Sequence, residues 1–330
     1  MQRIQRRQLL KLGAGAALIT AASGLRRPAQ SQDFSGTIRI GFWPIAAGLP
    51  LYLGVGKGIF EDFGLTVEAV RLGTAQQVAE GIISGRLEGS ANGTASGALA
   101  VAEIASPGLF KIIATNPSNA DHVLDQFLVP IDSPIQAISE LSGKRVASAP
   151  GAQNVTVAQG ILAANGVTDV EIQPLDISQH VPALQAGQLD AVYTLEPTGT
   201  IGSSLGITRV LEAGVVAKYL LGDPQANWSG GAATLTTEFI EQYPETTQTY
   251  IDAYRAAIED IRQDPVGARA FLSGYTAIEG DLAQAVPLAA YLMYDEFTPA
   301  DVASFQKFYD FLTDAEIFSR SLDVSTLLYS

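Results

Sequence analysis

Apolar positions along the chain form short continuous runs that alternate with helix-spaced stripes, and this pattern occurs twice. The first copy spans residues 38–92. Its run Ile38–Phe42 predicts a strand, residues 50–58 a helix and Leu65–Leu72 a second strand, before another helix and a third strand. A chain that reads strand, loop, helix, strand, helix, strand is typical of a parallel sheet covered by helices.

The second copy spans residues 144–197, with predicted strands at Arg145–Ser148 and Val170–Leu175. In both copies a turn precedes the third strand with the same order of residue types: small, glycine, polar, leucine, acid, small. These turns are Ser84–Gly89 and Ala186–Ala191. Two such lobes in one α/β chain imply a cleft between them, and ligands of open parallel sheets bind beyond the carboxyl ends of the strands.

The remaining segments set the predicted domain limits. Residues 126–129 carry the chain to the second lobe and the run 232–236 returns it to the first. We therefore expect lobe one at residues 37–128 plus 232–330 and lobe two at 129–231.

Aromatic stripes in the last third are expected to pack in the core rather than bind ligand. Helices are predicted there at residues 238–242, 244–263, 265–273, 280–292 and 299–314.

The first 31 residues are expected to be a signal peptide rather than part of the fold. Arg6-Arg7 is followed by Leu9-Leu10-Lys11 and a weakly apolar run over residues 12–25, which resembles a twin-arginine export signal. That run is shorter than the ~20 residues that span a bilayer. We expect a mature protein in the periplasm, or at the outer face of a Gram-positive cell.

Composition narrows the chemistry. The 330 residues include no cysteine and two histidines, His122 and His180, so thiolate or multi-histidine metal sites are excluded, and we expect no catalytic residue, metal or cofactor. Removal of residues 1–31 takes away six basic and no acidic residues, which shifts the formal charge from −14 to −20. Such a surface repels nucleic acid and anionic lipid, so the expected partner is a small molecule.

Candidate ligand residues lie in loops that follow predicted strands. These loops carry amides, hydroxyls and helix-start N–H groups but no lysine or arginine, which favours a small anion or organic acid such as a sulfonate, nitrate or carboxylate. The predicted ligand-binding residues are Trp43, Pro44, Gly48, Leu49, Asn92, Thr94, Asn116, Gln153, Asn154, Val155, Glu196 and Trp228.

Four of the polar and aromatic residues have alternative roles. Trp43 is as suited to core packing as to covering a ligand, whereas Trp228, flanked by Asn and Gly, is predicted to be exposed. Glu196 can accept a hydrogen bond from the ligand or form a structural bond near a hinge. His180 is expected to be a surface or capping residue.

Several segments resemble one protein family. Leu49–Glu68, Leu141–Ala147, Pro150-Gly151 and Leu189–Val192 leading to Glu196-Pro197 are similar, in order, to the nitrate/sulfonate/taurine and thiamine-precursor (NMT1/SsuA-like) group of ABC-transporter substrate-binding proteins. The resemblance covers about residues 38–215. It implies a type II periplasmic-binding-protein fold with two hinge crossings, and a monomer that delivers its ligand to an ABC permease in the inner membrane.

The chain departs from the family pattern at two places. Leu195 stands where members have tryptophan before Glu-Pro, and the first loop lacks the histidine typical of the thiamine-precursor type. Two other functions remain open at this point. The relatives of the pyrimidine-precursor and menaquinone pathways suggest an enzyme on the same fold, and a ligand-sensing subunit of a membrane receptor is the second alternative.

Overall fold

The computed structural model describes residues 34–92 and 97–330. The predicted signal peptide and the predicted site residue Thr94 lie outside the described residues. In the described part of the chain, no helix has the length and apolar character needed to cross a membrane. Residues 32–330 form one unit, so its elements can be placed relative to each other.

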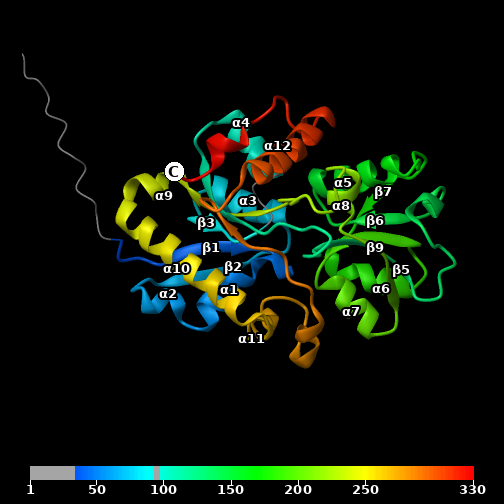
Figure 1. The fold of residues 1–330 in the computed structure, drawn as a ribbon, viewed down its shortest axis with the longest axis horizontal. Coiled ribbons are helices and arrows are strands. Elements are labelled where there is room, and N and C mark those ends of the chain that lie inside the picture. The colour runs from blue at the N-terminus through cyan, green and yellow to red at the C-terminus, as the bar shows by residue number, and fades with distance from the viewer. Residues whose placement is uncertain (1–33, 93–96) are drawn as a thin grey trace, which may run out of the picture. The chain divides into compact units, whose positions relative to one another are not determined.

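The strands form two sheets, which lie side by side with their own helices (Figure 1). The six-stranded sheet has the order β11-β4-β10-β3-β1-β2 and the five-stranded sheet the order β7-β6-β8-β5-β9. The strands are β1 Ile38–Phe42, β2 Val67–Arg71, β3 Gly89–Ser90, β4 Phe110–Thr115, β5 Asp125–Pro130, β6 Val146–Ser148, β7 Ile172–Pro174, β8 Ala191–Leu195, β9 Thr208–Ala213, β10 Ala232–Thr236 and β11 Leu292–Met293.

The two predicted modules are confirmed as parallel units. In the first, β1 pairs in parallel with β2 and β3. In the second, β6 pairs in parallel with β7 and β8. Each sheet also receives an antiparallel strand from a crossing of the chain: β10 lies between β3 and β4, and β5 lies between β8 and β9. All of β5, from Asp125 onwards, therefore belongs to the five-stranded sheet.

Helices cover both sheets and follow the predicted periodicity. Their bounds are α1 Leu49–Gly56, α2 Ile59–Asp62, α3 Ala75–Ile83, α4 Ala98–Ala105, α5 Ala152–Ala164, α6 His180–Gln185, α7 Thr198–Ser204, α8 Val215–Tyr219, α9 Thr237–Gln242, α10 Pro244–Gln263, α11 Pro265–Ala268 and α12 Pro299–Asp314. The aromatic side chains at helical spacing on α10 and α12 are buried, which confirms their predicted place in the core.

An arginine–carboxylate pair occurs at the same place in each module. Arg39 of β1 contacts Glu88 through its backbone N–H and its guanidinium, and Arg145, directly before β6, does the same with Asp190. Both acids belong to the repeated turn that precedes the third strand. Such bidentate contacts fix geometry well, so each pair aligns the first strand of its module with the third.

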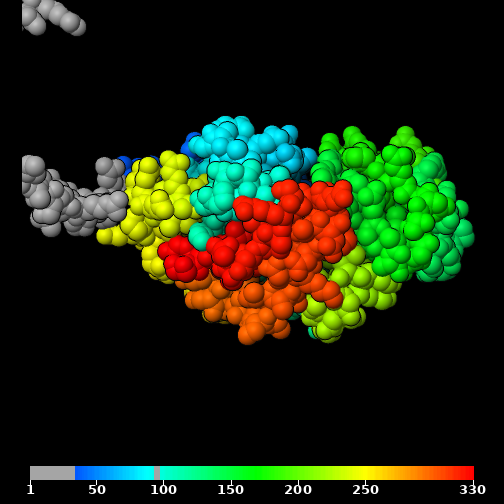
Figure 2. Space-filling model, turned by 90° about the horizontal axis from the view of Figure 1, so that it is seen from above, coloured from blue at the N-terminus to red at the C-terminus, as the bar shows by residue number. Residues whose placement is uncertain are grey.

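Two segments that cross between the sheets are hydrogen-bonded to each other. The backbone N–H of Ser118 donates to the carbonyl of Trp228 at 2.9 Å, and the N–H of Trp228 donates to the carbonyl of Ser118 at 2.9 Å. Helix α12 lies against the helices of the five-stranded sheet, where Lys307 Nζ donates to the carbonyl of Leu221 (Figure 2). The C-terminal third therefore contacts both halves of the fold.

One predicted helix is wrong. Residues 280–292 form only a short 3₁₀ helix, Gly280–Ala285, and then an extended segment that ends in β11. Pro287 explains the difference, because a proline disfavours helical geometry at the residue before it and cannot donate a helical hydrogen bond. The extended segment is held instead by the N–H of Ala290, which donates to the carbonyl of Pro117.

Gly89 of β3 gives a test of how closely the central strands of the six-stranded sheet approach each other. A Cβ atom there would lie 2.2 Å from the backbone carbonyl oxygen of Thr234. Gly89→Ala should therefore lower the free energy of unfolding by about 2 kcal/mol or more, because backbone must shift to admit the methyl group. Urea unfolding followed by circular dichroism measures the change.

The matched control is Gly73→Ala, where the added atom meets only the flexible end of Gln77. Its unfolding free energy should stay within about 0.5 kcal/mol of the wild type. Equal effects of the two substitutions would contradict the close approach of β3 and β10.

Candidate functional site

A cavity of about 400 Å³ lies between the two halves of the fold. It is bordered by segments that follow strands: Trp43 and Ile45 after β1, the start of α3 after β2, and Pro150–Asn154 after β6. Helix α4 and the crossing segments complete it. The cavity thus occupies the position expected for a ligand at the carboxyl ends of parallel strands.

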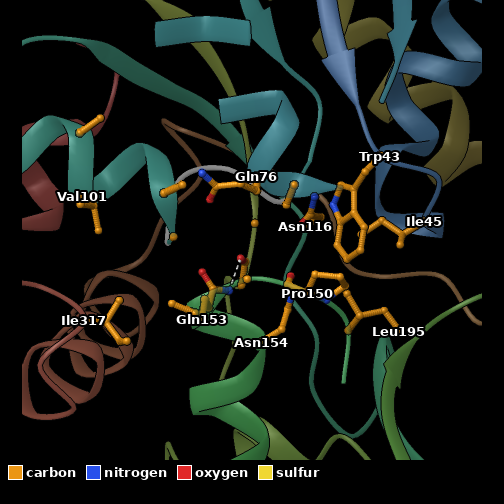
Figure 3. Close-up of a pocket in the computed structure, with 18 of the residues that line it drawn as sticks. Trp43, Ile45, Gln76, Val101, Asn116, Pro150, Gln153, Asn154, Leu195 and Ile317 are labelled. Atoms are coloured by element: carbon orange, nitrogen blue, oxygen red, sulfur yellow. Dashed lines mark hydrogen bonds between the residues drawn. The ribbon is translucent and has the colours of Figure 1, made fainter. Parts of the chain in front are cut away.

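Figure 3 shows how the labelled side chains surround this space. Trp43, Ile45 and Leu195 lie on one side, and Val101 and Ile317 on the other. The polar groups lie between these apolar sides and come from different elements: Gln76 from α3, Asn116 from the segment after β4, and Gln153 and Asn154 from the first turn of α5. The site therefore presents a polar middle between two apolar walls.

The loop that carries Trp43 is fixed by Asn92 and Tyr52. The N–H of Trp43 donates to Asn92 Oδ1 at 3.2 Å, and Asn92 Nδ2 donates to the Trp43 carbonyl at 3.1 Å. The Tyr52 hydroxyl donates to the carbonyl of Ile45 at 3.1 Å. Position 48 requires glycine, because a Cβ atom there would lie 2.3 Å from the Tyr52 hydroxyl oxygen. These residues hold the indole in place without themselves lining the cavity.

The first turn of α5 borders the cavity. Its N-cap residue is Gly151, with φ of 106°, and no side chain caps the helix start. The neighbouring amides bond elsewhere: Asn154 Nδ2 donates to the Pro150 carbonyl at 2.8 Å and Gln153 Nε2 to the Gly230 carbonyl at 3.2 Å. A helix start with open N–H groups and a positive dipole end favours an acceptor atom of a ligand.

Three buried polar atoms at the cavity have no partner among the described residues. These are the indole Nε1 of Trp43, the indole Nε1 of Trp228 and Oδ1 of Asn116, whose residues are 4%, 3% and 3% exposed. The other end of the Asn116 amide is occupied, because Nδ2 donates to the carbonyl of Ala47. Buried donors and acceptors are normally paired, so these three atoms are exceptions, and all belong to residues that border the cavity.

Five of the predicted ligand residues border the cavity: Trp43, Asn116, Gln153, Asn154 and Trp228. The structure does not bring Pro44, Gly48, Leu49, Asn92, Val155 or Glu196 to its lining. The prediction that Trp228 is exposed is wrong, since its ring packs against Phe308 of α12 at 5.8 Å between centroids. The local sequence, with Asn and Gly as neighbours, does not reveal this long-range contact.

The sequence reasoning missed the contribution of α4. Ala98, Val101, Ala102 and Ala105 of this helix line the cavity, as does Gly97 before it. The signal was present, because small residues at positions i, i+4 and i+7 leave room beside one face of a helix.

Glu196 has a structural role at a different cavity. Its carboxylate accepts hydrogen bonds from Gln126 Nε2 at 2.7 Å and from the N–H and hydroxyl of Thr200, and it lines a second cavity beside α7. Burial raises the pKa of Glu196, and the bonds from Gln126 and Thr200 oppose that rise. Its backbone joins the halves of the fold, since its carbonyl accepts from the N–H of Ala46.

His180 is fully buried, so the expectation of a surface or capping residue is wrong. Nε2 lies 2.9 Å from the carbonyl oxygen of Leu175 and Nδ1 lies 3.0 Å from the hydroxyl of Thr194. One neutral tautomer satisfies both contacts, with Nε2–H as donor and Nδ1 as acceptor. Desolvation lowers the pKa of His180 to about 4, so the ring is neutral in the folded protein at pH 7.

No group of three or more His, Cys, Asp or Glu residues in the described ranges is arranged to hold a metal ion.

Comparison with known proteins identifies the family. The family model described as "NMT1/THI5 like" matches residues 47–268, about two thirds of the chain. The chain belongs to the NMT1/THI5-like family. This confirms the resemblance that the sequence motifs indicated. No curated protein matches this NMT1/THI5-like chain.

Solved structures share the fold at low identity. The alkanesulfonate-binding protein SsuA from Xanthomonas axonopodis pv. citri, bound to MOPS, has a TM-score of 0.71 and 17% identity over 89% of this chain and 98% of its own. The periplasmic nitrate-binding protein NrtA from Synechocystis PCC 6803 has a TM-score of 0.65 and 14% identity over 89% and 84%. The desulfurization enzyme DszB has a TM-score of 0.60 and 14% identity over 88% and 96%. The fold class predicted from the sequence is therefore confirmed.

The buried His180 predicts a pH dependence of stability. Because its folded pKa lies below the ordinary value of 6.5, its contribution is complete above pH 6.5 and is lost as the pH falls towards 4. When the pH falls from 7 to 5, protonation of His180 should lower the free energy of unfolding of the wild type by about 2 kcal/mol. The His180→Gln variant should not show this loss. Urea titrations at the two pH values measure it.

His122→Gln is the matched control, because His122 is exposed. This variant should keep the pH dependence of the wild type. If His180→Gln and the wild type lose the same free energy between pH 7 and pH 5, the neutral buried ring is not the cause.

Proposed function

We propose that the protein is an exported solute-binding protein, which captures a small molecule between two lobes and delivers it to an ABC permease. The single observation that carries the proposal is the cavity of about 400 Å³ between the two sheets, whose described lining consists of amide, indole and apolar side chains. Its size suits a small organic ligand, since ligand pockets measure roughly 300–1,000 Å³. The family and the shared fold support the same function.

The arrangement of the chain supports a two-lobed action. We propose two lobes, one around each sheet, with the first boundary at Asp125 instead of residue 128, because all of β5 belongs to the five-stranded sheet. Lobe one is then residues 37–124 plus 232–330 and lobe two residues 125–231, with the crossing segments paired at Ser118 and Trp228 as the hinge. A ligand that contacts Trp43 from one lobe and the start of α5 from the other would stabilise the closed form. Hinge closure around a ligand is a common way for two lobes to respond to binding.

The chemical character of the lining favours binding over catalysis. The described lining residues carry amides, indoles and aliphatic groups, which bind a ligand but do not exchange protons at neutral pH. The buried Glu196 and His180 are held by internal hydrogen bonds and do not belong to the lining. We therefore propose a transport role ahead of an enzyme like DszB.

The proposed location and assembly follow from the same function. The twin-arginine-like segment at Arg6-Arg7 supports export to the periplasm, or to the outer face of a Gram-positive cell. We propose that the monomer contacts the permease. A sensing subunit would present the same closed form to a membrane receptor, and the neighbouring genes, for a permease and ATPase or for a kinase, distinguish the two roles.

Blocking the cavity tests ligand capture. Ala102 of α4 lines the cavity, so Ala102→Phe should fill it and lower ligand occupancy at least tenfold. Native mass spectrometry of protein purified from the periplasm of the source organism measures the occupancy through the added mass of a small molecule. The wild type should also show a smaller radius of gyration in solution scattering when the molecule is bound than after its removal.

Ala163→Phe is the matched control, because Ala163 is exposed near the end of α5 and outside the lining. It should keep the occupancy of the wild type. A small molecule that remains bound to the Ala102→Phe variant at wild-type occupancy would show that this cavity is not the binding site.

A further inference from the structure

The cleft cavity is lined without a formal charge among the described residues. Its polar lining consists of the amides of Gln76, Asn116, Gln153 and Asn154 and the two indoles. No side chain of this described lining can therefore form an ion pair with a ligand.

The rim of the cavity leaves large apolar side chains in solvent. Val101 of α4 is 43% exposed and Ile83 at the end of α3 is 52% exposed, and both border the cavity. Figure 3 places Val101 and Ile317 across from Trp43 and Leu195. A ligand with an apolar body would cover the apolar surface on both sides of the cavity and remove that surface from water.

The polar lining indicates the polar part of the ligand. The carboxamides of Gln76, Asn116, Gln153 and Asn154 contain both N–H donors and carbonyl acceptors. The first turn of α5 also borders the cavity, with a helix start that no side chain caps. The set fits a molecule with oxygen or nitrogen acceptors.

Electrostatics decides between an anion and an uncharged acceptor. A carboxylate or sulfonate in this cavity would lose its hydration with no arginine or lysine to replace it, and the partial charge at one helix start compensates only a part of that loss. A carbonyl, amide or ether oxygen accepts the same N–H bonds without the cost of burying an ion. The net charge of the chain, −14, opposes an anion further.

We propose, on the basis of the solute-binding role, that the ligand is an uncharged organic molecule with an apolar body and hydrogen-bond acceptors, rather than nitrate or a sulfonate. The polar middle between Trp43 and Val101 binds the acceptors, and the apolar walls enclose the body. The side chains of the cavity therefore favour a different ligand class from the small anion expected from the loop sequences.

A pair of fluorescent probes tests the ligand class. N-phenyl-1-naphthylamine is uncharged, and 1-anilinonaphthalene-8-sulfonate has the same ring skeleton with an added sulfonate. Titration of the full mature chain with each probe should show saturable binding, with a dissociation constant at least tenfold lower for the uncharged probe. Ala102→Phe should abolish the signal of the uncharged probe, which places that probe in the cavity.

A charge introduced at the rim should change the selectivity. Val101→Arg adds a cation beside the cavity, so the ratio of the two dissociation constants should shift at least tenfold in favour of the sulfonate. Ile131→Arg is the matched control, since Ile131 is 53% exposed and lies outside the lining, and its ratio should equal that of the wild type.

Three results would overturn the proposal. If the sulfonate binds the wild type as tightly as the uncharged probe, or more tightly, the ligand class is wrong while the solute-binding role stands. If Val101→Arg leaves the ratio unchanged, the absence of charge at this rim does not set selectivity. If neither probe binds saturably while native mass spectrometry shows a small molecule bound to the wild type, the ligand class is wrong and the solute-binding role stands.

Discussion

The mutual backbone hydrogen bonds of Ser118 and Trp228 are the constraint on which the arrangement of the site depends. They join the two crossing segments, so that each segment limits the path of the other between the sheets. Asn119 extends the connection through Asn227 to Asp301 at the start of α12. Because Asn116 and the indole of Trp228 lie beside this pairing, the polar atoms that border the cavity are placed by the crossing itself.

The internal duplication supplies the framework of the fold, but the residues that follow the third strand differ between the two copies. Arg39–Glu88 and Arg145–Asp190 fix equivalent strands in the two modules. At the end of β3, Asn92 holds the Trp43 loop, whereas at the end of β8, Glu196 is held by Gln126 and Thr200. These two strand-end residues support the side chains that border the cavity instead of contacting it. The asymmetry of the walls therefore arises from the loops that these residues position.

The cavity combines many donors with no charge, and this sets its selectivity. The amides of the lining and the first turn of α5 can donate hydrogen bonds to any acceptor, but an ion must also give up its hydration. An uncharged ligand avoids that loss and gains from the burial of apolar surface against Val101 and Leu195. Discrimination between ligands would follow from the cost of desolvating the wrong one, as much as from contacts with the right one.

The sequence by itself determined the framework of this protein. Hydrophobic periodicity and the repeated turns predicted the parallel modules and the helices α10 and α12, because these depend on local backbone preference and on burial of one face. The resemblance of separate motifs to known proteins indicated the family. Only the tertiary structure decided which side chains reach the cavity. The burial of His180 and Trp228, the helical face of α4 that lines the cavity and the internal bonds of Glu196 arise from contacts between residues far apart in the chain. Such contacts leave no mark in local sequence, since they depend on how the two sheets and the C-terminal helices pack together.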